Sequence, residues 1–333
     1  MVRCGWCYGE EAEKRCSKCL KRCYCSRECQ VCDWKSGHKA WCGCAGEVGA
    51  DFEVRDAGAG KGLGVFALVA LERGAKIMTE RAALTKGGLR DGEAANAPEA
   101  TIRAAMALMP EGGDLEAKVA LNGMGCSEEG GGFGSDETGL FITMSRVNHA
   151  CLANAVHYYH EDSGVKILVA SRHIAAGEEI TFNYVPAEQI KAVVDPKKLL
   201  AAKWKITACD CRACADPLIA AKLQRAADLD DNIIAFGQRA DFARGLRCGE
   251  ALLRIYDELQ ESPWQYSRTY YDMFQLAVAR RSTMTKAKQY IKLAHDNRAL
   301  FLGPKKSDHV LRNFARLMTS PETHRNYLIG HGR

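Results

Sequence analysis

The 333-residue sequence contains no hydrophobic run long enough to cross a membrane, which takes about 18 consecutive apolar residues. The first residues, MVRCGWCYGEEAEKRC, also lack the apolar stretch of a secretory signal. These two absences exclude the common patterns of membrane-spanning and secreted chains. We therefore expect a soluble protein of the cytoplasm, the nucleus or both, with no membrane partner.

The sequence also has little excess of charge. The formal net charge is +5, from 46 Lys and Arg against 41 Asp and Glu that are mixed along the chain. This balance does not require a nucleic-acid partner. The cysteine and histidine spacing lacks the recognition-helix pattern of a C₂H₂ finger as well. Nucleic acid is therefore not expected as the primary ligand.

Cysteine, in contrast, is abundant and unevenly distributed. Ten of the 16 cysteines lie within residues 4–44 and three within residues 209–214, and the others are Cys126, Cys151 and Cys248. In a reducing compartment such clusters indicate metal binding rather than disulfides.

The middle of the chain, residues 50–214, carries glycine-punctuated strand patterns. Residues 155–160 and 165–172 predict two strands joined by the turn residues Asp162, Ser163 and Gly164. Between the strand-rich halves, residues 85–140 predict a helical insert. Its Asn96-Ala-Pro98 predicts a helix start, followed by apolar Ile102, Met106 and Met109.

From about residue 215 the sequence has helical periodicity. Apolar residues recur at intervals of three and four in three sets: Leu252, Ile255, Tyr256 and Leu259; Tyr270, Met273, Phe274 and Ala277; Val310, Phe314 and Leu317. Pro263 and the pair Gly303-Pro304 separate the segments. We expect an antiparallel helical array of the helix-pair (TPR-like) kind, although no strict repeat period is visible.

The N-terminal cysteines are spaced as metal ligands. The pairs are Cys4-x2-Cys7, Cys16-x2-Cys19, Cys25-x3-Cys29 and His38-x3-Cys42. Eight such ligands make two closed tetrahedral zinc sites. A segment of about 40 residues cannot fold on its apolar core alone, and zinc binding worth about 10–16 kcal/mol supplies the difference. Cys23, Cys32 and Cys44 are left over as buried or incidental thiols.

This segment resembles the MYND zinc finger. The paired cysteines, Tyr24-Cys25, Cys29-Gln30, Trp34 and HKAWC follow that family's order. The resemblance implies interleaved pairs, with one zinc on Cys4, Cys7, Cys25 and Cys29 and the other on Cys16, Cys19, His38 and Cys42. It also implies a protein partner for the finger, often a proline-rich peptide.

The stretch SRVNHACLAN at residues 145–154 permits several interpretations. A Cys–His–Asn nucleophilic site is disfavoured, because three groups within four residues cannot all converge. Cys151 could instead be a buried thiol or a zinc ligand. Cys209, Cys211 and Cys214 leave a tetrahedral site one ligand short. From the residues alone Cys126, Cys151 and Cys248 all remain candidates for the fourth.

Four motifs occur in the order seen in SET-domain lysine methyltransferases: GKGLGVFA, NHACLAN, GEEITFNY and CDCRAC. The chain resembles the branch that combines SET with MYND. The resemblance implies an α+β fold with several parts. They are a MYND-type finger at 1–44, a β-rich SET domain at 50–84 and 141–186 with a pseudoknot and the helical insert 85–140, a zinc-bound post-SET segment at 187–216, and an all-α domain at 217–333.

The same resemblance implies the site residues. Asn148 and His149 would contact S-adenosylmethionine, and the backbone of Lys61, Gly62 and Leu63 would lie along it. Tyr184 matches the catalytic tyrosine. Cys151 would join Cys209, Cys211 and Cys214 on a third structural zinc. The chain departs from the family at Ala150 and Ala153, where the family usually has Ser and Pro. Its finger also precedes GKGLG, whereas in the best-known members the finger is inserted inside the SET domain.

The function expected from this resemblance is S-adenosylmethionine-dependent N-methylation of lysines in histone or other proteins, by a monomer. A narrow apolar channel would lower the pKa of the acceptor lysine, ordinarily about 10.4, so that the amine is neutral. Phe182 either lines this channel, where it would favour multiple methylation, or is a core residue. The alternative function is a zinc-dependent adaptor with an inactive SET domain.

Overall fold

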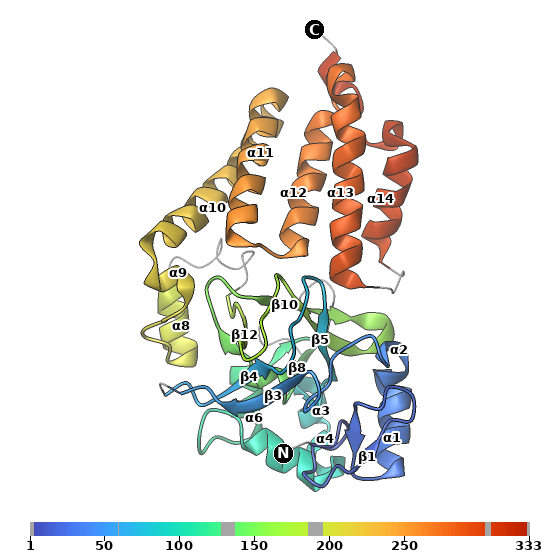
Figure 1. Cartoon of the computed structure of the whole chain (residues 1–333), viewed down its shortest axis with the longest axis vertical. Helices are drawn as coiled ribbons and strands as arrows, with labels where there is room; N and C mark the ends of the chain where they lie inside the picture. Colours follow the sequence, from blue (N-terminus) through green and yellow to red (C-terminus); the bar gives the residue numbers. More distant parts are fainter. Residues whose placement is uncertain (1–2, 59, 128–136, 186–195, 304–307, 332–333) are drawn as a thin grey trace. The chain divides into compact units, whose positions relative to one another are not determined.

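The computed structural model describes residues 3–58, 60–127, 137–185, 196–303 and 308–331. The chain divides into two compact units, residues 1–209 and residues 210–333 (Figure 1). No helix among these residues is both long and apolar enough to cross a bilayer. The predicted segment 187–216 falls partly outside the described residues and spans the boundary between the units.

The cysteine-rich segment at the N-terminus is a small hairpin followed by helix. Its elements are β1 (Lys14–Arg15), β2 (Cys23–Tyr24), α1 (Arg27–Asp33), the π-helical turn η1 (Trp34–His38) and α2 (Lys39–Trp41). Ser26 caps α1 by accepting a hydrogen bond from the backbone N–H of Cys29. Gly37, with φ of 141°, kinks the helical run, a conformation that favours glycine.

Three small sheets form the body of the first unit (Figure 1). Their strand orders are β3–β4–β12–β9, β10–β11–β5 and β6–β8–β7. The strands are β3 (Phe52–Asp56), β4 (Leu63–Ala67), β5 (Lys76–Arg81), β6 (Leu84–Thr85), β7 (Met124–Gly125), β8 (Thr138–Leu140), β9 (Asn148–His149), β10 (Ala155–His160), β11 (Val165–Ala170) and β12 (Glu179–Phe182).

The predicted hairpin is present as β10 and β11, paired antiparallel with Ala155 opposite Ala170. A 3₁₀ turn, η3 (Glu161–Ser163), and Gly164 with φ of 63° connect the strands, as the turn residues predict. The second strand ends at Ala170 rather than Arg172, and the backbone N–H of Ser171 donates to the carbonyl of Asn154 just beyond the last register pair. All six residues of β11 are buried, so this strand is central to the fold.

The apolar faces of the larger sheets share one core. Its fully buried members include Val65, Ile77, Phe141, Met144, Leu168 and Ile180. At about 25 cal/mol per Å² of buried apolar surface, such a cluster is the main favourable term in folding this unit. The core therefore fixes the strands that carry the motifs GKGLGVFA and GEEITFNY.

The predicted insert contains helices and also strands. Its helices are α3 (Lys86–Arg90), α4 (Glu93–Asn96), α5 (Glu99–Met106) and α6 (Leu115–Asn122), and α8 (Pro196–Trp204) comes later in the unit. Helix α5 starts after Pro98, as predicted. Its buried face, however, is Thr101, Ala104 and Ala105, whereas Met106 and Met109 are exposed. Small residues therefore make the close contacts of this helix.

The second unit is helical. Its helices are α9 (Arg212–Ala215), α10 (Pro217–Gln238), α11 (Phe242–Leu259), α12 (Pro263–Ala277), α13 (Met284–Leu302) and α14 (His309–Thr319), with the 3₁₀ turns η4 (Arg281–Thr283), η5 (Pro321–Thr323) and η6 (Ile329–His331). Another 3₁₀ turn, η2 (Met144–Arg146), belongs to the first unit.

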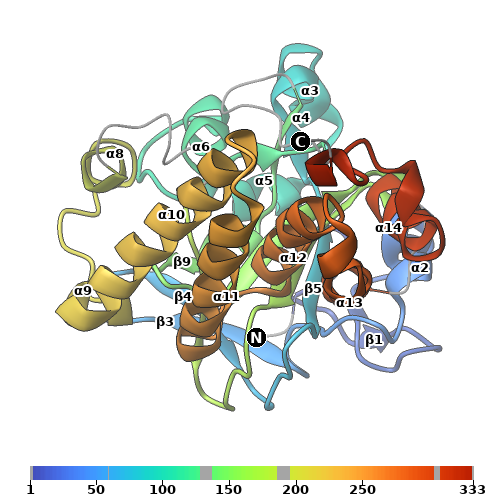
Figure 2. The same cartoon turned by 90° about the horizontal axis from the view of Figure 1, so that it is seen from above.

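Successive long helices of the second unit pack side by side and are joined by short connections (Figures 1 and 2). Side chains of Asp216, Asp241, Ser262 and Asp308 cap four of them. The apolar spacing predicted this array, since Leu252, Met273, Phe274 and Phe314 are all in its core.

Candidate functional site

The first predicted cysteine set converges in space. The ligand atoms of Cys4, Cys7, Cys25 and Cys29 all lie within 4.8 Å of one another. The Cys7–Cys25 sulfur distance is 3.6 Å and the Cys25–Cys29 distance is 3.5 Å. A tetrahedral zinc with Zn–S bonds of about 2.3 Å requires sulfur–sulfur edges of about 3.8 Å. The four thiols therefore fit a structural zinc.

The second set, Cys16, Cys19, His38 and Cys42, converges in the same way, within 4.8 Å. Cys16 and Cys42 are 3.8 Å apart at sulfur, and Nε2 of His38 is 3.7 Å from the Cys19 sulfur. Three thiols and one imidazole are also a zinc donor set. The structure thus pairs the ligands in the interleaved order expected from the sequence.

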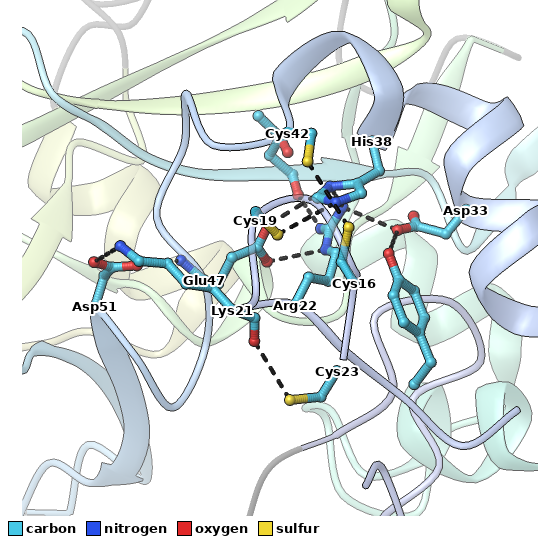
Figure 3. A network of polar contacts seen from close by, with 12 residues as sticks. Cys16, Cys19, Lys21, Arg22, Cys23, Asp33, His38, Cys42, Glu47 and Asp51 are labelled. Carbon is cyan, nitrogen blue, oxygen red and sulfur yellow. Dashed lines mark hydrogen bonds and ion pairs between the residues drawn. The ribbon is translucent and has the colours of Figure 1, made fainter. Parts of the chain in front are cut away.

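A buried charge network surrounds this second set and continues into the sheets (Figure 3). Arg22 Nη1 donates to Asp33 Oδ2 at 3.2 Å, its Nε lies 2.9 Å from Glu47 Oε2, and its Nη2 donates to the Thr79 carbonyl at 2.9 Å. The Arg22, Asp33 and Glu47 side chains are only 6–12% exposed. Burial raises the pKa of Glu47 to about 7, against the opposing effect of Arg22.

Further contacts attach the cysteine-rich segment to the strands. The Tyr8 hydroxyl donates to Glu80 Oε1 at 2.9 Å, and Glu80 also accepts from the backbone N–H groups of Thr143 and Met144. Trp41 Nε1 donates to Ser163 Oγ at 3.0 Å. The segment is therefore one packed body with the sheets, an arrangement that the sequence did not predict.

The NHACLAN stretch is fixed by pairing with GEEITFNY. Strand β9 runs parallel to β12, with Asn148 opposite Thr181 and His149 opposite Phe182. Strand β12 also pairs with β4, which begins at Leu63. Three of the four predicted motifs are thereby brought to one sheet.

Asn148 joins the glycine motif directly. Its Nδ2 donates to the Leu63 carbonyl at 3.3 Å and to Glu179 Oε1 at 2.8 Å. Gly64 permits this approach, since a Cβ there would lie 2.7 Å from Glu179 Oε1. Because both Nδ2 protons have acceptors, Asn148 Oδ1 faces away as a carbonyl acceptor.

The backbone around Lys61 and Gly62 forms a tight turn next to this contact. Lys61 N–H donates to the Gly58 carbonyl, and the Gly62 carbonyl accepts from Ala57. Gly62 has φ of 74°, the region where glycine is preferred. The residues predicted to contact the cofactor, 61–63 and 148, are thus adjacent.

Tyr184 is held at three points. Its hydroxyl donates to the Val147 carbonyl at 2.9 Å, its backbone N–H donates to His149 Nδ1 at 3.1 Å, and the two rings are 5.3 Å apart. Burial raises the pKa of Tyr184 well above its ordinary value. The phenol is therefore protonated and rigidly placed.

Tyr184 belongs to a row of four rings, which we call the aromatic row. Its centroid distances are 4.7 Å for His157–Phe182, 5.3 Å for Phe182–Tyr184 and 5.2 Å for Tyr184–Trp204. Phe182 is 6% exposed and packs in the core, so its core interpretation holds together with its position next to Tyr184. Trp204 Nε1 donates to the Leu121 carbonyl at 3.2 Å.

His157 and Trp204 were missed by sequence reasoning. His157 alternates with Ala155 and Tyr159 along a strand, which indicates the inward face. Trp204 lies five residues before Cys209, and that closeness to a motif was the signal available. Neither residue has a spacing that identifies it without the fold.

The third cysteine group includes Cys151. The sulfur atoms of Cys151, Cys209, Cys211 and Cys214 lie within 4.8 Å of one another, and Nε2 of His149 is 3.4 Å from the Cys151 sulfur. The other two candidates are elsewhere: Cys126 packs against the sheet core and Cys248 against the helical core. Cys32 and Cys44 are exposed and Cys23 is buried.

Residues 62–185 match the family model of the SET domain. The chain therefore contains a SET domain, made of β4 through β12 and Tyr184. SET domains are generally lysine methyltransferases that use S-adenosylmethionine, so the match supports a methyltransferase activity. The match covers neither the cysteine-rich segment nor the helical unit. No curated protein matches the chain.

Proposed function

We propose that this protein is an S-adenosylmethionine-dependent protein-lysine N-methyltransferase. The observation that carries the proposal is the placement of Tyr184. Its hydroxyl is fixed on the Val147 carbonyl, beside Asn148 and His149, within the matched SET domain. A protonated, immobile phenol in an aromatic row is suited to orienting groups around a transferred methyl.

The residues proposed for the cofactor are Lys61, Gly62, Leu63, Asn148, His149 and Tyr184. Asn148 Oδ1 is an acceptor for an amino group, and the turn at Gly62 leaves the backbone close to it. S-adenosylmethionine, when bound, supplies a sulfonium methyl group, and transfer to the amine nitrogen breaks the S–C bond and leaves a thioether. The protein's part is alignment of donor and acceptor.

The aromatic row is proposed as one wall of the path for the acceptor lysine. Apolar rings such as Phe182 and Trp204 raise the cost of an ammonium group and lower the pKa of a lysine that lies against this wall. The amine then loses its proton to water before it attacks. An uncharged nitrogen lone pair is required to form the new N–C bond.

We further propose that the three cysteine groups each hold one structural zinc and that residues 4–42 form a MYND-type finger. The interatomic distances and the donor sets support this assignment. The zinc ions would stabilise the segment and perform no chemistry. A protein partner for the finger is part of the same proposal.

Methyl transfer from labelled S-adenosylmethionine to core histones and to a mixed-protein lysate tests the proposal. Label in lysine N-methyl groups is the expected result. Calorimetric titration with S-adenosylmethionine separates the alternative, because a protein that binds none of it is an adaptor with an inactive SET domain.

A further inference from the structure

His157 is a histidine that the proposed mechanism does not use. It comes from the middle of β10, and its ring meets Phe182 edge-on at 4.7 Å and 87°. It therefore extends the aromatic row by one ring beyond Phe182. Phe182 has no polar ring atom, and the ring N–H of Trp204 can donate a hydrogen bond but not accept one. His157 and Tyr184 are therefore the two rings of the row that can accept a hydrogen bond.

The two nitrogens of His157 have no hydrogen-bond partner within the described parts of the chain. Neither nitrogen is among the enclosed polar atoms that lack a partner, and the residue is partly buried. Both nitrogens therefore retain accessible surface. An imidazole with accessible nitrogens can take a hydrogen-bond partner from outside the described parts of the chain, such as water or a bound ligand.

The imidazole is also uncharged. Burial, reinforced by the nearby Lys166 ammonium, lowers the pKa of His157 to about 3. A neutral imidazole has one nitrogen that accepts a hydrogen bond and one that donates. At physiological pH it offers an acceptor to any N–H group that enters the space next to Phe182.

Phe182 itself has no polar atom to offer. If the aromatic row lines the lysine path, as the proposed function requires, His157 is the ring that can engage the amine of the acceptor. An amine with zero, one or two methyl groups can donate a hydrogen bond after it gains a proton, whereas a trimethylated nitrogen cannot.

We propose that His157 determines the degree of methylation by accepting a hydrogen bond from the acceptor lysine. The contact holds the partly methylated nitrogen by its N–H and disfavours its reorientation for another transfer. The proposal rests on the proposed function. The product is then mainly mono- or dimethyllysine.

The test compares His157→Leu, which keeps the size and removes the acceptor, with His157→Asn, which keeps a polar acceptor. His173→Leu is the matched control, because the His173 side chain is 53% exposed and lies outside the aromatic row. Core histones are methylated by each variant, and mass spectrometry gives the ratio of trimethyl to monomethyl lysine. His157→Leu should raise this ratio about tenfold, the factor for one ordinary hydrogen bond. His157→Asn should lie nearer the wild type and His173→Leu should equal it.

A second measurement does not depend on turnover. Lysine-containing histone peptides in the un-, mono-, di- and trimethylated forms are titrated into the wild-type protein with S-adenosylhomocysteine, and the His157 imidazole is followed by ¹³C NMR. The resonance should shift with the first three peptides and not with the trimethylated one. Thermal unfolding verifies that each variant is folded.

The outcomes separate the two proposals. The role of His157 alone is overturned if the wild-type protein methylates or binds the peptides but shows neither expected effect. In that outcome His157→Leu leaves the products unchanged, and the His157 resonance does not depend on the methylation state of the peptide. A wild-type protein that neither methylates nor binds any peptide overturns the proposed function and the role of His157 with it.

Discussion

The backbone N–H of Tyr184 donates to Nδ1 of His149 at 3.1 Å. Since a backbone N–H can only donate, Nδ1 is the acceptor and the neutral ring carries its proton on Nε2. Nε2 lies 3.4 Å from the Cys151 sulfur. One imidazole thus connects the tyrosine backbone to the third cysteine group, and it is occupied with positioning rather than proton transfer.

The Tyr184 hydroxyl is expected to be essential for methyl transfer. Tyr184→Phe removes the bond to the Val147 carbonyl while keeping the ring, so the packing of the aromatic row persists. Activity with labelled S-adenosylmethionine should fall by about 10²-fold, the size found when one preorganised hydrogen-bonding group is removed from an active site. Zinc content should be unchanged. Tyr158→Phe, on the neighbouring strand β10, is the control, and full activity in Tyr184→Phe would refute the assignment.

Metal analysis of the purified protein should give three zinc ions per chain. Cys151→Ser should reduce the number to two, because a structural site with one thiolate missing binds zinc far more weakly. Cys44→Ser, at an exposed cysteine outside the three groups, should leave three. A wild-type value of two with no change in Cys151→Ser would contradict the third site.

Removing Arg22 should destabilise the first unit strongly. Arg22→Met leaves the buried carboxylates of Asp33 and Glu47 without their cation, which costs about 3–5 kcal/mol. Arg103→Met removes an exposed pair with Glu99 and should cost less than about 1 kcal/mol. Urea unfolding, monitored by hydrogen exchange, measures the free energy of unfolding of both variants. Equal stability of the two variants would mean that the network contributes little.

The stability of the protein below neutral pH should depend on His157. Its pKa is lowered from 6.5 to about 3 in the folded state, so the unfolded chain binds the additional proton between these values. Its contribution to stability is therefore complete above pH 6.5 and is lost as the pH falls toward 3. The unfolding free energy of His157→Leu should fall less steeply than that of the wild type between pH 6.5 and 5.5, by up to about 1.4 kcal/mol per pH unit. Urea midpoints at the two pH values give the difference, and parallel slopes would show that the imidazole is already solvated when folded.

The sequence predicted those features that depend on local spacing. The cysteine pairs of the cysteine-rich segment, the β10–β11 hairpin and the helical array follow from intervals of two to four residues, because local geometry decides them. The grouping of the cysteine pairs into two ligand sets came instead from the resemblance to the MYND finger. The buried face of α5 was not predicted from the sequence. Close helix packing buries the small residues Ala104 and Ala105, whereas Met106 is exposed.

The contacts between distant segments were not predictable. Asn148 reaches Leu63 across 85 positions and Tyr8 reaches Glu80 across 72, and no periodicity records such pairs. His157 and Trp204 became recognisable only through the rings that they touch. Single buried charges such as Arg22 look like surface residues in a sequence, since arginine is usually exposed.

The attachment of the cysteine-rich segment has a consequence for the order of folding. Tyr8 and Trp41 are made early on the ribosome, yet their partners Glu80 and Ser163 are made 72 and 122 residues later, respectively. Metal binding can organise the first 44 residues as soon as they are made. The side chains of this segment that contact the strands, however, lack their partners until β11 has been synthesised. A fragment that ends near residue 44 would therefore expose to solvent a surface that is buried in the whole chain. The shortest fragment suitable for study of this segment extends through the SET domain.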